Sequence, residues 1–260
     1  MKTTLFFLAL ICLCSCATLP PRKPTGLTPG AFWAEQSHRT NQLPRLEGKL
    51  VLRLQSKAQN VSGQGRFVQQ GPGLSRLELR DPLGRLQLVL AEDESSFVAY
   101  YPRQKEAFVD KQGGKAYVRK FVGVGLSFSE LEKLLYGVLP SRFSGTFDKW
   151  EWDSTHAAYR GELSHGSVVA YVDPDNASLL ELELHFDDEV FHAVFSDPES
   201  CCNEATPSAS FPLARDVRAE LSQSHNSIEV EWDRVHREES LRPNSIFRVS
   251  LPEDVKKIEL

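Results

Sequence analysis

The chain has 260 residues, of which 41% are hydrophobic and 25% charged, and its formal net charge is −5. A nucleic-acid-binding surface needs a basic face, so this acidic balance predicts no nucleic-acid partner. After the first residues, no segment approaches the roughly 18 uninterrupted apolar residues of a spanning helix. The length suits one large β domain or two small ones, and no second linker divides the chain.

Residues 1–15 have the features of a signal peptide, with one positive charge, an apolar stretch over Leu5–Leu13 and small residues after it. The following Cys16 completes a stretch that resembles a bacterial lipobox, Leu13-Cys14-Ser15-Cys16. The resemblance predicts cleavage before Cys16 and acylation of its thiol and amino groups. Cys14 fits less well, because Leu13 would then stand where a small residue is needed. Plain secretion with an unmodified Cys16 is the alternative.

An acylated Cys16 would anchor the protein without spanning the bilayer. Each buried methylene of an acyl chain contributes about 0.8 kcal/mol to the free energy of membrane binding, so two chains make a stable anchor. The next residue is Ala17. An Asp at this position would resemble the inner-membrane retention signal of enteric bacteria. The periplasmic face of the outer membrane is therefore the expected location. Residues 16–30 contain four prolines and no apolar period, which indicates a stiff linker between the anchor and the body.

Residues 31–43 are expected to form a short helix. Apolar and polar residues then alternate through the first half, which is typical of strands buried on one face. Six strands joined by short turns predict an antiparallel sheet that curls. The first two strands are Leu46–Leu54 and Val61–Gln70. The third carries Leu77 and Leu79, and the fourth carries Leu86, Leu88 and Leu90. The last two are Phe97–Tyr101 and Glu106–Asp110.

The turn Asp81-Pro82-Leu83-Gly84 joins the two middle strands. Pro82 presets φ and Gly84 tolerates a positive φ, so the chain reverses with Leu83 at the tip. Hairpin tips are usually polar. Leu83 is therefore either folded back onto the sheet or offered to something apolar outside.

Two helices are expected after Gly113, over Ala116–Val122 and Phe128–Leu139. The second has a capping box, Ser127 with Glu130, and an apolar stripe formed by Phe128, Leu131, Leu134, Leu135 and Val138. Glu132 is expected on the opposite face of this helix. The stripe would cover the open mouth of a half-barrel, either as a lid or merely to close the core.

The second half returns to strands, expected at Phe147–Asp153, His156–Ser164, Ser167–Asp173, Ser178–Phe186, Val190–Ser196, Pro212–Ser222, Ser227–His236 and Ile246–Ser250. A polar loop between them carries Cys201-Cys202. Adjacent cysteines cannot pair without strain, so these two pair between molecules, form a strained vicinal disulfide or stay reduced.

A catalytic site needs a nucleophile, a base or a metal set at suitable spacing, and the chain has no GxSxG, HExxH or P-loop motif. The best metal candidate is one hairpin that holds His185, Asp187, Asp188 and His192. Exposed strand ends produce such clusters by chance, so neither an enzyme, a metal nor a cofactor is expected.

The first half resembles the outer-membrane lipoprotein receptor family LolB, in order and spacing, from about Phe32 to Pro140. The matching segments are Arg45-Leu46-Glu47-Gly48-Lys49-Leu50, Asp81-Pro82-Leu83-Gly84, Gly125-Leu126, Leu135-Tyr136-Gly137 and Leu139-Pro140. The resemblance implies an incomplete antiparallel β-barrel with a helical lid. Its apolar cavity would take lipoprotein acyl chains, such as palmitate, from a periplasmic carrier similar to LolA. In that family an exposed leucine on a protruding loop helps to place the cargo in the membrane, and the motif falls on Leu83.

The resemblance weakens in the second half, and the longer C-terminal part resembles uncharacterised lipoproteins of the same fold. The fold class expected is therefore mainly antiparallel β, a half-open barrel with a helical lid, as a single monomeric domain over residues 31–260. Its function would be that of a lipoprotein receptor and chaperone. The alternatives are a lipoprotein that binds another lipid and a structural envelope lipoprotein. The cavity would be lined by Leu50, Leu52, Leu77, Leu79, Leu86, Leu88, Leu90, Leu131, Leu134 and Leu135.

Overall fold

The computed structural model describes residues 25–42, 45–71, 73–186, 189–196, 198–201, 211–237 and 242–260. The expected signal peptide, Cys16 and Cys202 lie outside these residues, so the structure does not bear on them. Among the described helices, none is long and apolar enough to cross a membrane.

The helices are α2 (Pro29–Gln42), α3 (Lys115–Phe121) and α4 (Phe128–Leu135), with short 3₁₀ helices η2 (Ser141–Phe143) and η4 (Asn244–Phe247). The strands are β1 (Leu46–Gln55), β2 (Asn60–Gln69), β3 (Ser75–Arg80), β4 (Leu86–Asp93), β5 (Ser96–Tyr101), β6 (Glu106–Asp110), β7 (Phe147–Asp153), β8 (Ala158–Leu163), β9 (Val168–Val172), β10 (Leu179–Phe186), β11 (Glu189–Phe195), β12 (Pro198–Cys201), β13 (Phe211–Ala214), β14 (Asp216–Leu221), β15 (Ser227–Arg237) and β16 (Lys256–Glu259).

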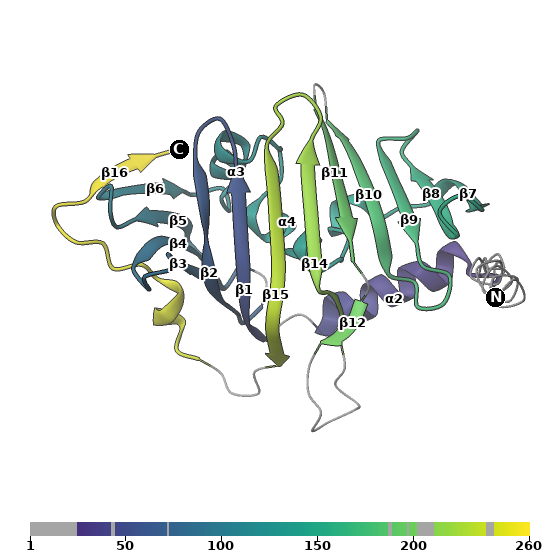
Figure 1. Ribbon diagram of the computed structural model, residues 1–260, viewed down its shortest axis with the longest axis horizontal. Helices are drawn as coiled ribbons and strands as arrows, with labels where there is room; N and C mark the ends of the chain where they lie inside the picture. The colour runs from purple at the N-terminus through teal and green to yellow at the C-terminus, as the bar shows by residue number, and fades with distance from the viewer. Residues whose placement is uncertain are drawn as a thin grey trace, which may run out of the picture.

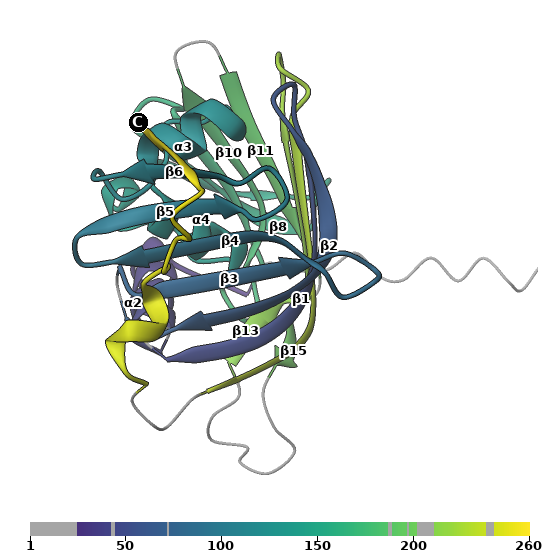
Figure 2. The same ribbon diagram turned by 90° about the vertical axis from the view of Figure 1, so that its left-hand side faces the viewer.

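Within the described residues, fourteen strands form one sheet in the order β16-β6-β5-β4-β3-β2-β1-β15-β14-β11-β10-β9-β8-β7. The neighbours are antiparallel apart from β16, which runs parallel to β6. The sheet is strongly curved but not closed, and its two ends turn toward each other around α3 and α4 (Figures 1 and 2). This architecture confirms the predicted half-open barrel with a helical lid.

Residue alternation explains which face of each strand is buried. In β1, the even-numbered residues from Leu46 to Leu54 point inward, and the exposed positions Lys49 and Arg53 fall on the other face. β2 carries glycine on its inward face, at Gly63 and Gly65, where its neighbours carry leucine. A Cβ at Gly65 would lie 2.8 Å from Leu50 Cδ1, so the glycine leaves room for the Leu50 side chain of the neighbouring strand.

Local sequence fixes both ends of α4. At the N-terminus, the Ser127 hydroxyl accepts from the Glu130 amide at 3.2 Å, and the Glu130 carboxylate accepts from the Ser127 amide at 2.8 Å. At the C-terminus, Gly137 adopts φ 69°, and its amide donates to the Leu134 carbonyl at 2.9 Å. A helix of eight residues is marginal alone, so these caps and its packing hold it in place.

Helix α2 crosses the edge of the sheet below β7–β10 (Figure 1) and is fastened to it by buried polar contacts. Arg39 is 2% exposed; it donates to the Glu35 carboxylate at 2.8 Å and to the Asn176 carbonyl at 3.0 Å. The Gln36 side chain accepts from the Leu139 amide at 3.0 Å. Helix α2 therefore braces both the second half of the sheet and the segment that follows α4.

Several expected boundaries were wrong. The strand expected at Ile246–Ser250 is partly η4, and the C-terminal strand is β16 instead. The second lid helix ends at Leu135 rather than Leu139, since Gly137 reverses the backbone there. The strand expected over Pro212–Ser222 is divided into β13 and β14, which belong to different sheets.

A methyl group at Gly63 should destabilise the barrel wall. A Cβ there would lie 2.1 Å from the backbone oxygen of Arg80, which cannot move without shifting β3. We expect Gly63→Ala to lower the free energy of unfolding by about 2 kcal/mol, in the range for overpacked sites. Chemical denaturation measures the change.

The matched control is Gly125→Ala, whose Cβ meets nothing within 4 Å. It should change stability by less than about 0.5 kcal/mol. Equal effects of the two substitutions would contradict the steric role of Gly63.

Candidate functional site

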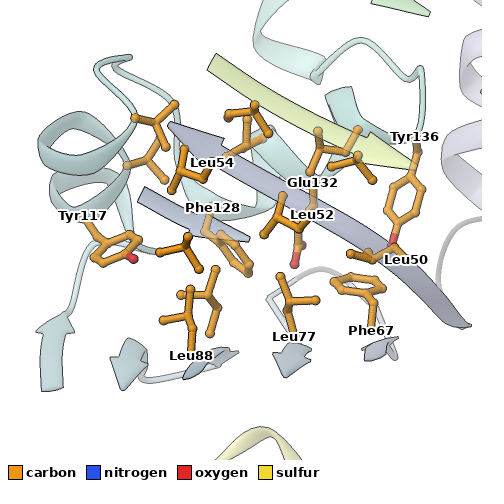
Figure 3. Close-up of a pocket in the computed structure, with 18 of the residues that line it drawn as sticks. Leu50, Leu52, Leu54, Phe67, Leu77, Leu88, Tyr117, Phe128, Glu132 and Tyr136 are labelled. Atoms are coloured by element: carbon orange, nitrogen blue, oxygen red, sulfur yellow. The ribbon is translucent and has the colours of Figure 1, made fainter. Parts of the chain in front are cut away.

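The concave face of the sheet encloses an apolar cavity of about 70 Å³ beneath α3 and α4 (Figure 3). Strands β1 to β4 and β15 form its floor and the two helices form its roof. The lining residues are Leu50, Leu52, Leu54, Val61, Phe67, Leu77, Leu88, Leu90, Tyr117, Val118, Val122, Phe128, Leu131, Glu132, Leu135, Tyr136, Ile228, Val230 and Trp232. We call α3 and α4 together the lid.

One end of the lid is attached to the sheet by aromatic rings. Tyr136, directly after α4, stacks on Trp232 of β15 with ring centroids 5.4 Å apart. Phe67 of β2 meets both rings edge to face, with centroid distances of 5.8 and 6.0 Å. Such ring pairs add to the stability that comes from apolar burial alone, so this cluster closes the cavity firmly.

The other end of the lid is attached by a hydrogen-bonded chain. The hydroxyls of Tyr117 in α3 and Tyr101 in β5 lie 2.5 Å apart. The Tyr101 hydroxyl also donates to the side chain of Gln59, in the turn between β1 and β2. Helix α3 is therefore tied to a turn that neighbours the cavity floor.

Glu132 was expected on the outer face of α4, and this was wrong. Its side chain is 3% exposed and points from α4 into the cavity, between Phe128 and Leu77 (Figure 3). Neither carboxyl oxygen has a well-formed hydrogen bond among the described residues. Burial raises the pKa of Glu132 well above its usual range, and nearby Glu92 raises it further. The Ser75 hydroxyl, which is also unpartnered among those residues, lies close enough to lower the pKa of Glu132 in part.

Two further carboxyl groups lie on the inward face of the sheet near Glu132. Glu92 of β4 is a direct cross-strand neighbour of the buried Ser75, and burial together with Asp110 raises the pKa of Glu92 to about 7. Asp110 is fully buried, but it accepts from the amides of Gln112 at 2.7 Å and Ala116 at 2.8 Å. Asp110 is thus a structural cap for α3, whereas one oxygen of Glu92 has no hydrogen-bond partner among the described residues.

The structure brings most of the predicted acyl-cavity residues together. The ones that line the cavity are Leu50, Leu52, Leu77, Leu88, Leu90, Leu131 and Leu135. Leu79 and Leu134 are buried in the core beside it, and Leu86 is half-buried at the start of β4. Binding of acyl chains by these residues stays a prediction.

Sequence reasoning missed the contribution of β15, namely Ile228, Val230 and Trp232. These residues lie some 175 positions after β1 along the chain, yet β15 pairs directly with β1, for example Leu52 with Val230. Their period of two indicated an inward face but not which strand they would join. Phe67 had the same kind of signal, whereas Tyr117 lies in the helix expected over Ala116–Val122.

The turn at Leu83 protrudes, and the Leu83 side chain is 77% exposed, so it is not folded back onto the sheet. The Asp81 carboxylate organises the turn, since Oδ1 accepts from the amides of Leu83 and Arg85, both at 2.9 Å. Oδ2 accepts from the Arg85 guanidinium at 2.7 Å, and this contact holds the pKa of Asp81 below its usual range. The apolar tip is therefore presented on a rigid hairpin.

The proposed metal hairpin is only partly described, because Asp187 and Asp188 lie outside the described residues. His192 Nε2 lies 2.6 Å from a Glu181 carboxylate oxygen, and His185 Nε2 lies 3.5 Å from Glu183. Glu181, Glu183 and His192 could converge on one ion. Each side chain already has an ion-pair partner, so the geometry gives no particular reason for a metal.

No family model and no curated protein matches this sequence. Solved structures do match it. A domain assigned to outer membrane lipoprotein sorting from Vibrio parahaemolyticus has a TM-score of 0.55 and 11% identity, over 82% of this chain and 94% of that one. A DUF1329 family protein from Desulfovibrio piger has a TM-score of 0.57 and 10% identity, over 84% and 96%. A LolA superfamily protein from Nitrosomonas europaea has a TM-score of 0.50 and 10% identity, over 86% and 98%.

Identities this low establish the fold alone. The matches extend over most of this chain and nearly the whole of each neighbour. The chain therefore has a LolA-like fold, the fold of these lipoprotein-sorting, DUF1329 and LolA-superfamily proteins.

Proposed function

We propose that this protein is a lipid-anchored receptor of the bacterial outer membrane that takes lipoprotein acyl chains into the cavity beneath the lid and helps to insert lipoproteins into that membrane. The observation that carries the proposal is an apolar cavity roofed by two short helices. Two structural neighbours, one assigned to lipoprotein sorting and one to the LolA superfamily, support it. The donor would be a periplasmic carrier similar to LolA.

The lid has to move for cargo to enter. The cavity of about 70 Å³ is far smaller than the roughly 300–1,000 Å³ of pockets that hold drug-sized ligands. The strands of the floor are joined by continuous hydrogen bonding, whereas the lid is attached by side-chain contacts at its two ends. Opening should therefore displace α3 and α4 and leave the sheet unchanged.

Binding would depend on apolar area rather than on chain chemistry. Each Å² of hydrocarbon that leaves water contributes about 25 cal/mol, so an acyl chain that displaces the lid gains affinity over its whole length. Among the described lining residues, Glu132 alone carries an ionisable carboxyl group, and none is basic. Such a cavity is suited to hydrocarbon and has no lysine or arginine to fix an anionic headgroup.

Leu83 would deliver the cargo. An exposed leucine on a well-ordered turn can enter the acyl region of a bilayer at little cost. Acylation of Cys16 would keep this turn near the membrane, with residues 16–30 as the tether.

Filling the cavity should abolish lipid binding. Leu52 lies on its floor, near the centre of the view in Figure 3, so Leu52→Trp places a large ring in the space the chain would occupy. We expect at least a tenfold weaker affinity for a fluorescent fatty acid, about 1.4 kcal/mol. Titration of the purified protein measures it.

The control is Val51→Trp, the adjacent residue, which points to the outer face of β1. It should bind as the unaltered protein does. Lipid mass spectrometry on protein isolated from its own membrane then separates the functions: bound lipoprotein supports the receptor, another lipid supports a different carrier, and a protein that holds and binds no lipid would be structural.

Leu83→Glu should separate binding from delivery. A charged residue costs about 2.5–3.5 kcal/mol at the bilayer centre, whereas an exposed substitution changes stability by less than about 0.5 kcal/mol. We therefore expect an unchanged melting temperature, unchanged fatty-acid affinity and a loss of lipoprotein transfer to liposomes. Transfer is measured by flotation of the liposomes.

Val194→Glu is the matched control, since Val194 is also an exposed apolar residue, at 44%, but lies within β11. It should transfer lipoprotein normally. Normal transfer by Leu83→Glu as well would refute the delivery role of the turn.

The anchor is tested by Cys16→Ser, which removes the predicted acylation site. We expect the signal peptide to remain uncleaved and the acyl mass to be lost, as measured by intact mass spectrometry of the membrane fraction. Cys14→Ser, two residues earlier, should be processed and acylated normally. Acylated mature protein from the Cys16→Ser variant would rule out the lipobox interpretation.

A further inference from the structure

Glu132 is an unusual residue to find in a cavity for hydrocarbon. Glu132 is 3% exposed, neither of its carboxyl oxygens has a hydrogen-bond partner among the described residues, and its side chain points among leucine and phenylalanine side chains (Figure 3). An unpaired polar group in such a place costs stability that a leucine would not. A ligand that bonds to this group would recover that cost.

The surroundings of Glu132 favour the protonated form of its carboxyl group. Burial is the main reason why its pKa is raised, Glu92 on β4 adds to the shift, and Ser75 on β3 and Lys133 on α4 oppose it only in part. A neutral carboxylic acid donates one hydrogen bond through its hydroxyl group. An apolar site disfavours the anion, and the neutral form can act there as a hydrogen-bond donor.

A second unpartnered donor lies one helical turn further on. The Tyr136 hydroxyl lines the same cavity, is 1% exposed for the whole residue and has no partner among the described residues. Burial and the proximity of Glu132 raise its pKa as well, so the hydroxyl remains protonated. Figure 3 shows the hydroxyl near Leu50, on the same side of the lid as the Glu132 carboxyl group.

The geometry points to a carbonyl-binding subsite in the lid, in which Glu132 and Tyr136 donate hydrogen bonds to the ester or amide carbonyl oxygens of an acylated ligand. The inference rests on the proposed function and names its ligand class: acyl chains in ester or amide linkage, as in a diacylglyceryl or N-acyl group, rather than plain hydrocarbon. A cationic amine is the less favoured partner, because it would require a buried ion pair in a site that keeps its acid neutral.

Three dibrominated probes of equal chain length test the subsite: a methyl ester, an alkane and an alkylammonium. Bromine on a bound chain quenches Trp232, which lines the cavity. The purified full-length protein is titrated at one fixed detergent concentration, so that micelles take up each probe equally for every variant. The variants are Glu132→Leu, which removes the donor, and Glu132→Gln, whose amide still donates.

We expect Glu132→Leu to bind the ester about tenfold more weakly while its affinity for the alkane is unchanged or higher. Glu132→Gln should retain ester binding within about threefold, since its amide replaces the hydroxyl donor. Melting temperatures of both variants check that the fold is intact. A merely structural role for Glu132 would change ester and alkane affinity together.

A pH series gives an independent readout. The ionisable groups that face Glu132 are Glu92 on β4 and Lys133 and Tyr136 at the end of α4, with Asp110 on β6 next to Glu92. Ester binding should fall in the unaltered protein as pH rises and Glu132 ionises, because a carboxylate cannot donate. It should fall less in Glu132→Gln, which has no proton to lose at this position.

The outcomes are distinct. Two results would overturn the subsite and leave the proposed function unaffected. One is an equal loss of ester and alkane binding in Glu132→Leu. The other is alkylammonium binding that exceeds ester binding and is lost in Glu132→Gln. Absence of Trp232 quenching by all three probes would instead refute the proposed function. Selective loss of ester binding in Glu132→Leu, with rescue in Glu132→Gln, would establish the subsite.

Discussion

The structure depends on one constraint: an antiparallel sheet that curves but does not close exposes an apolar concave face, which has to be covered. Strands β1 to β4 and β15 turn leucine, phenylalanine and tryptophan inward, and water on that face would cost about 25 cal/mol per Å². The lid meets this need with few residues of its own. Its attachments include the Tyr136–Trp232 stack at one end and, at the other, the Tyr101–Tyr117 hydrogen bond and the Asp110 carboxylate that accepts from the Ala116 amide.

The same constraint links fold to function. Ligand hydrocarbon can replace the lid as the cover of the concave face, since both are apolar and the exchange leaves the sheet intact. A closed barrel would have no such exchangeable cover. Gly65 of β2 helps to shape the floor of the cavity, because its lack of a side chain lets Leu50 and Leu77 approach each other.

The buried polar side chains differ in whether the fold gives them hydrogen-bond partners. Asp110 is satisfied by backbone amides, and Asp81 by the turn that presents Leu83, so both have structural roles. Glu132 and Tyr136 are different, because they are buried in the lid without hydrogen-bond partners in the part of the chain that the structure describes. Natural proteins rarely bury such groups without a use for them, and the use that we propose is recognition of the linkage that carries the acyl chain.

The sequence by itself determined the curled antiparallel sheet, the capped lid helix and the inward leucines of β1, β3 and β4, because alternation, turn residues and caps are local signals. It also located the Leu83 turn but left open whether Leu83 is buried. Tertiary structure alone decided that β15 joins β1, since strand pairing between distant segments has no local signature. It also decided where Glu132 points: α4 is buried around most of its circumference, with Leu131, Glu132 and Leu134 all inside, so helical periodicity could not identify an outer face.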